Sequence, residues 1–153
     1  MSDQFGSREA KRILIIDDEE HCRRAAVEAL EGLEGVELVA PDTLEECLRI
    51  AFQEKVDIAL IDNSLNNPLF QEPPWSEEEY GGMRGCQIVN RLARENSGVI
   101  RLGFSNSSIT MMDTDVTGWF ERKFELESKV TDIRVEAQQR LREFVVGMSI
   151  NSL

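Results

Sequence analysis

The chain has 153 residues, and its 17 Lys and Arg against 29 Asp and Glu give a formal net charge of −12 at pH 7. A negative charge of this size disfavours direct contact with the phosphate backbone of nucleic acids. No apolar run approaches the roughly 20 residues of a membrane span, and the first residues lack the apolar segment of an export signal. We therefore expect one cytoplasmic globular domain that inserts into no membrane.

Short apolar runs alternate with longer amphipathic stretches along most of the chain. Runs of Ile, Leu and Val are typical of parallel strands that are buried on both faces. Apolar residues at three- and four-residue steps indicate amphipathic helices. After a flexible tail over 1–10, the pattern predicts strands at 12–16, 36–40, 58–61, 99–104 and 116–120, and helices at 19–31, from Leu44 to about Ala51, from about Met83 to Leu92, and at 125–148.

The last predicted helix is the longest, and its apolar positions define the face that should be buried. Its turns beyond about Arg140 could extend past the domain and pair with a second copy of the chain. The predicted buried positions are Leu126, Val130, Ile133, Ala137, Leu141 and Phe144.

The order of elements predicts the fold. Strands that alternate with helices form a parallel sheet with helices on both faces. Short right-handed crossovers then leave a doubly wound α/β sheet of five strands, in the flavodoxin-like order 2-1-3-4-5, as the simplest solution. We expect this domain to cover 11–148, with a long loop after the third strand and a fourth helix that is short at most.

Acidic side chains follow the first and third predicted strands where each strand ends. Asp17 and Asp18 come after the first strand, and Asp62 comes after the third. The carboxyl ends of parallel strands meet at one edge of the sheet, where ligands of such folds bind. Three carboxylates that meet there need a cation, and oxygen ligands suit Mg²⁺. The sequence therefore predicts a magnesium site at this edge.

With Ser105 after the fourth strand and Lys123 after the fifth, this set resembles the receiver domain of two-component response regulators, over about residues 11–147. That family has an acidic pair, an acceptor aspartate, a hydroxyl residue and a lysine at these four strand ends. The resemblance implies that Asp62 accepts a phosphoryl group in a Mg²⁺-dependent reaction, and that Ser105 and Lys123 contact this group. The magnesium ligands that it implies are Asp17, Asp18, Asp62 and the backbone carbonyl of Ser64.

The cation after the fifth strand has two candidates. The segment 119–124 resembles the family's ending, but Lys123 is not followed by the family's proline. If the family's lysine is aligned with a lysine of this segment, it corresponds to Lys123. If the segment is aligned with the family's ending without a gap, the family's lysine corresponds to Arg122. Because successive strand residues point to opposite faces, only one of the two can reach Asp62, and we favour Lys123.

The resemblance also implies partners. A histidine kinase or phosphotransfer protein would supply the phosphoryl group, and altered binding to a downstream protein would be the output. The alternative is a pseudo-receiver that binds proteins without phosphorylation. We do not expect an enzyme beyond its own phosphorylation and dephosphorylation, because a phosphohydrolase of this topology needs a proton-donating acid where Ser64 stands.

The chain departs from the family mainly in an insertion at 66–82 and in a shortened segment after Ser105. The insertion could cover the site, present its aromatic residues to a partner, or form ordinary surface. Trp119 could be a switch residue or part of the core. We interpret His21 as a partly exposed helix residue rather than a ligand, and the three cysteines have the spacing of neither a zinc site nor a disulfide framework.

Overall fold

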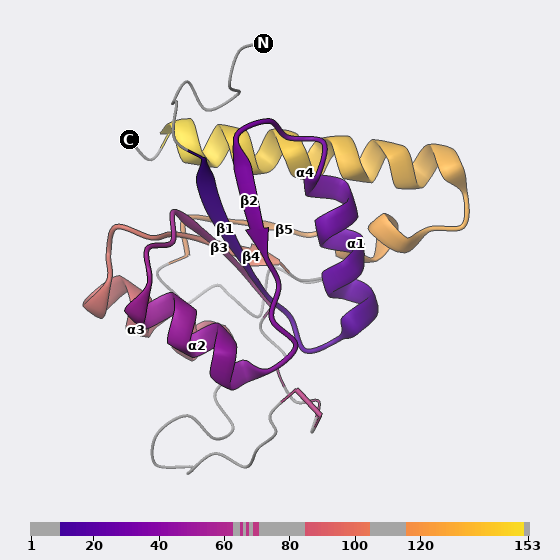
Figure 1. Ribbon diagram of the computed structural model, residues 1–153. Coiled ribbons are helices and arrows are strands. Elements are labelled where there is room, and N and C mark those ends of the chain that lie inside the picture. Colours follow the sequence, from indigo (N-terminus) through magenta and orange to yellow (C-terminus); the bar gives the residue numbers. More distant parts are fainter. Residues whose placement is uncertain are drawn as a thin grey trace.

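The predicted five-stranded parallel sheet is present, in the order β2-β1-β3-β4-β5 (Figure 1). The computed structural model describes residues 10–62, 65, 67, 69, 70, 85–104 and 116–151. The strands are β1 Lys11–Ile16, β2 Val36–Val39, β3 Ile58–Ile61, β4 Ile100–Phe104 and β5 Gly118–Phe120. The helices are α1 Glu20–Leu30, α2 Leu44–Gln53, α3 Gly85–Glu95, the 3-10 helix η2 Lys123–Glu127 and α4 Thr131–Asn151.

The register of the central strands places the acidic residues side by side. Strand β1 pairs in parallel with both β2 and β3, and its last residue, Ile16, is aligned with Ile61, the last residue of β3. The Asp62 backbone N–H continues this ladder by donating to the Ile16 carbonyl over 2.8 Å. The chain therefore leaves β1 and β3 at the same edge of the sheet.

Alternate residues of β1 belong to two separate cores. Ile13 and Ile15 pack with residues of α1 and α4, whereas Leu14 and Ile16 pack with residues of α2 and α3. Figure 1 shows these two pairs of helices on opposite faces of the sheet. This arrangement confirms the doubly wound fold, because a strand in the middle of such a sheet must be apolar on both faces.

Helices α1 and α2 lie where the sequence predicts helices, at 19–31 and from Leu44 onward. Helix α1 buries small residues against the sheet, among them Cys22 and Ala26. Helix α2 is capped by Thr43, whose Oγ1 accepts from the Glu46 N–H over 3.2 Å. This bond satisfies one of the backbone donors that a helix start leaves unpaired.

The prediction for the last helix was partly wrong. Helix α4 begins at Thr131 rather than at residue 125, because Ser128 has an extended backbone (φ −59°, ψ 137°) that separates it from η2. Leu126 is buried in η2, but Val130 and Ile133 are 55% and 42% exposed. The face of α4 that is buried against the sheet comprises Ala137, Leu141 and Val145.

Phe70, which follows β3 in the chain, packs into the domain. The Phe70 side chain is buried in the core beneath α2 and α3. The Phe70 backbone carbonyl accepts from the Leu44 N–H over 2.7 Å. Phe70 is therefore not presented to a partner, whereas its neighbour Leu69 is exposed. Most of the predicted insertion 66–82, the predicted short fourth helix and nearly all of the tail 1–10 lie outside the described residues.

In the part of the chain that the structure describes, none of the helices has both the length and the apolar character that crossing a membrane requires.

Candidate cation site at the carboxyl edge of the sheet

Three aspartates converge where β1 and β3 end. One carboxylate oxygen from each of Asp17, Asp18 and Asp62 lies within 4.8 Å of the other two, and all three residues are buried. Their position follows from the parallel register, since Asp17 and Asp62 are the first residues beyond the aligned ends of the two strands. We call these three residues together with Lys123 the carboxylate site.

Lys123 supplies the positive charge of the site. It is the first residue of η2, shortly after β5, and its Nζ lies 2.5 Å from Asp17 Oδ2 and 3.4 Å from Asp62 Oδ2. Its Nζ also lies 5.2 Å from the centre of the Phe104 ring, which favours a cation. Arg122 is exposed, and its guanidinium lies 3.7 Å from the carboxylate of Glu125. Of the two candidate cations, Lys123 is therefore the one that lies at the carboxylates.

Burial and mutual repulsion make the site costly to ionise. Burial raises the pKa of Asp62 to about 7, and the charges of Asp17 and Asp18 add to this effect while Lys123 opposes it. Burial also raises the pKa of Asp17 above its ordinary value, despite the contact with Lys123. For Lys123, burial acts to lower the pKa, but Asp17 and Asp62 outweigh it and the pKa is raised. The lysine therefore stays charged between acids that ionise reluctantly.

The donor set fits a small divalent cation. One lysine cannot balance three ionised carboxylates, so the full set carries net negative charge in a buried position. Among the described residues, no correctly angled hydrogen bond reaches the buried Asp17 Oδ2, although Lys123 Nζ lies close to it. Oxygen ligands alone suit Mg²⁺ or Mn²⁺ rather than the softer transition metals.

Asp17 and Asp18 are held in place by contacts from three segments. Asp17 Oδ1 accepts from the Glu19 N–H over 3.0 Å, and Arg23 donates to the Asp17 carbonyl over 2.8 Å. Asp18 Oδ2 accepts from the Asn67 N–H over 3.0 Å, and the Asn67 side chain donates to the Asp18 carbonyl. The sequence analysis missed Asn67, because nothing in the sequence pattern after β3 marks this residue as a partner of the first strand.

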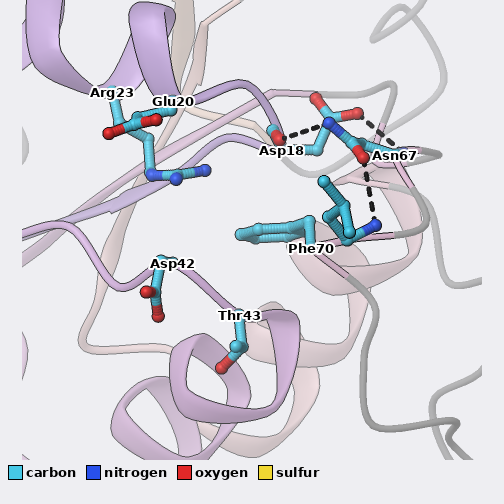
Figure 2. Close-up of a pocket in the computed structure, with 8 residues that line it drawn as sticks. Asp18, Glu20, Arg23, Asp42, Thr43, Asn67 and Phe70 are labelled. Atoms are coloured by element: carbon cyan, nitrogen blue, oxygen red, sulfur yellow. Dashed lines mark hydrogen bonds between the residues drawn. The ribbon is translucent and has the colours of Figure 1, made fainter.

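A pocket of about 340 Å³ opens beside Asp18 (Figure 2). It lies between the start of α1, the residues just before α2, and Asn67, Leu69 and Phe70. Its charged residues are three acids and one arginine, so it does not resemble a site for anions. It borders the carboxylate site at Asp18 alone among the four residues of that site. The lining residues are Asp18, Glu20, Arg23, Asp42, Thr43, Asn67, Leu69 and Phe70.

Two predicted site residues, Ser64 and Ser105, lie outside the described residues. Trp119 is partly buried in β5, and its indole N–H donates to Glu121 Oε1 over 2.9 Å. Neither a switch role nor a full core position follows from this contact. The structure therefore brings together Asp17, Asp18, Asp62 and Lys123 out of the predicted set.

No family model and no curated protein sequence matches the chain. Solved structures do match its fold. A CheY-like response regulator receiver domain protein from Methanospirillum hungatei has a TM-score of 0.57 at 19% identity, over 87% of this chain and 99% of that chain. The response regulator domain of Thermotoga maritima CheB has a TM-score of 0.64 at 14% identity, over 92% and 97% of the two chains. The Mn²⁺-bound form of response regulator Rcp1 has a TM-score of 0.62 at 13% identity, over 89% and 94%.

These similarities cover nearly all of the chain, and they agree with its strand order. The chain therefore has the fold of response-regulator receiver domains.

Proposed function

We propose that this chain is a two-component receiver that accepts a phosphoryl group on Asp62 and signals by changing its binding to another protein. The observation that carries the proposal is the carboxylate site itself, with three buried aspartates and Lys123 at the carboxyl edge of a receiver-like sheet. The chain would act on no other substrate, and it would at most catalyse its own phosphorylation and dephosphorylation.

Asp62 is the proposed nucleophile. A bond forms between one of its carboxylate oxygens and phosphorus, while the bond from phosphorus to the donor breaks and its electron pair leaves with the donor. Because burial raises the pKa of Asp62 to about 7, nearby positive charge is needed to keep it ionised. Lys123 Nζ, at 3.4 Å from Asp62 Oδ2, provides part of that charge and can contact a phosphoryl oxygen.

The proposed magnesium ligands are Asp17, Asp18, Asp62 and the carbonyl of Ser64. When bound, Mg²⁺ would screen the negative charges of the acceptor and of the incoming phosphoryl group. Ser105 is proposed to contact another phosphoryl oxygen and so to draw the following loop inward. The switch would then draw its energy from contacts that form only in the phosphorylated state.

The proposed partners are a histidine kinase or phosphotransfer protein as donor and a downstream protein as effector, in the cytoplasm. Exposed apolar residues near the start of α4 support a protein-binding surface there, and Val130, Ile133 and Val135 are its members among the described residues. The same helix could pair two copies of the chain. The net charge of −12 supports an output that does not involve direct contact with nucleic acid.

A phosphorylation-independent pseudo-receiver is the second candidate. The observation that favours it is the bond from the Asn67 N–H to Asp18 Oδ2, because it occupies one oxygen of a proposed magnesium ligand. In that case the same fold would serve as a protein-binding module whose state does not depend on phosphate. The experiment below separates the two candidates.

The test is intact-mass analysis of the chain after incubation with acetyl phosphate. We expect one phosphoryl adduct with Mg²⁺, none with a chelator, and none in Asp62→Asn. Asp57→Asn is the matched control, because Asp57 lies at the other end of β3, where its carboxylate accepts from the Arg12 N–H over 2.8 Å. This control should keep the adduct. A folded wild-type chain that takes up no phosphoryl group in Mg²⁺ would favour the pseudo-receiver.

A further inference from the structure

A second group of potential metal ligands lies outside the carboxylate site. His21 and Cys22 are on the first turn of α1, and Glu127 is the last residue of η2. His21 Nδ1 lies 2.7 Å from Glu127 Oε1 and 3.6 Å from Cys22 Sγ. Cys22 Sγ lies 3.8 Å from Glu127 Oε2. We call these three residues the His–Cys–Glu cluster.

The separations suit a tetrahedral cation. Zinc bonds of about 2.0–2.3 Å to nitrogen, oxygen and sulfur place neighbouring ligand atoms about 3.4–3.6 Å apart. The two distances to Cys22 Sγ, 3.6 and 3.8 Å, are already near this range. Only the contact between His21 Nδ1 and Glu127 Oε1, at 2.7 Å, has to widen. Because both of these side chains are on the surface, a small rotation can provide the difference.

The chemical character of the ligands differs from that of the carboxylate site. The cluster offers one sulfur, one imidazole nitrogen and one carboxylate, a set that selects zinc-like cations over magnesium. Cys22 is 8% exposed, so its sulfur is fixed by the packing of α1. The His21 side chain is 63% exposed, which leaves solvent access for the ion and for a water molecule as the fourth ligand.

We propose that His21, Cys22 and Glu127 form a second metal site, which binds a zinc-type divalent cation and joins α1 to η2. Without the cation, burial raises the pKa of the Cys22 thiol to about 12, so binding must displace its proton into solvent. The ion would also fix the end of the η2 turn opposite to Lys123. The proposal is independent of whether Asp62 is phosphorylated.

The sequence pattern could not reveal this site. Adjacent His and Cys residues with no further Cys or His nearby match no common zinc spacing. The third ligand, Glu127, is 106 positions from His21 and reaches it only because η2 packs against α1. The alternative explanation is an ordinary hydrogen bond between His21 and Glu127 with a cysteine beside it.

Titration of the untagged full chain with Co²⁺ and with Zn²⁺ tests the site. Mg²⁺ is present in excess throughout, so that it occupies the hard oxygen ligands. We expect one equivalent of Co²⁺ to give a thiolate-to-cobalt charge-transfer band. His21 is the one histidine of the sequence, so Zn²⁺ should shift a single set of imidazole NMR signals. Cys22→Ser and Glu127→Gln should each weaken binding by at least about tenfold.

Cys86→Ser is the matched control, because Cys86 is partly exposed and lies on α3, on the other face of the sheet. It should bind as the wild type does. Glu127→Gln changes a surface residue, so it keeps the test valid if Cys22→Ser does not fold. Absence of the charge-transfer band, or binding that survives Cys22→Ser and Glu127→Gln but is lost in Asp18→Asn, would overturn the proposal.

Discussion

Replacement of Lys123 by methionine should lower the free energy of unfolding by about 3–5 kcal/mol at pH 8 without divalent cations. Methionine fills a similar volume, but it leaves the buried carboxylates of Asp17 and Asp62 without the ammonium that lies 2.5 and 3.4 Å from them. Removing one partner of a buried ion pair is costly because the remaining charge is no longer compensated. Denaturant unfolding at equilibrium measures the difference.

The loss in Lys123→Met should depend on pH and on metal. The orphaned carboxylates can take up protons, so the loss should be smaller at pH 5 than at pH 8. Mg²⁺ should recover part of the stability, because it binds the folded state alone. Lys129→Met is the control, since Lys129 is exposed, and it should change stability by less than about 0.5 kcal/mol. Equal stability of the two variants at pH 8 would contradict the compensating role of Lys123.

Replacement of Asp62 by asparagine should have the opposite effect and stabilise the cation-free protein at pH 8 by about 1–3 kcal/mol. Burial raises the pKa of Asp62 from its ordinary 3.8 to about 7 in the folded chain. A group whose pKa is raised by folding binds more protons in the folded state, so its ionisation lowers stability as pH rises from about 4 to about 7. The full difference in pKa corresponds to at most about 4 kcal/mol, and local relaxation reduces it.

Urea unfolding of Asp62→Asn and the wild type at pH 4, 6 and 8 tests this prediction. The gain should be near zero at pH 4, should appear between pH 4 and 7, and should be complete above pH 7. Glu28→Gln, an exposed change on α1, is the control and should stay within about 0.5 kcal/mol at every pH. A gain in Asp62→Asn that is the same at pH 4 and pH 8 would show that ionisation of Asp62 does not cost stability.

The central strands and the acids after them were predictable for one physical reason. A parallel strand buried on both faces leaves a nearly continuous apolar run, and the first polar residue after it marks the edge of the sheet. The same pattern predicts that Asp17, Asp18 and Asp62 lie together at that edge, as they do. The order of the strands followed from the alternation of strands and helices together with the usual right-handed crossovers.

Other features could not be obtained from local pattern. Val130 and Ile133 continue the apolar spacing of the last helix, yet Ser128 interrupts the helix and leaves both side chains exposed. The choice between Lys123 and Arg122 depends on how the chain turns after β5, and the missing proline left that turn undetermined. The bonds from Asn67 to Asp18 join residues 49 positions apart in a segment without periodicity.

The most direct test of the central claim is to locate the phosphoryl group by residue. The chain is incubated with acetyl phosphate and Mg²⁺, reduced with borohydride, which converts an aspartyl phosphate to homoserine, and digested for peptide mass analysis. The account predicts homoserine at position 62 and nowhere else, and none in a sample with chelator. Homoserine at position 17 or 18, or at no position while the chain remains folded, would contradict the account.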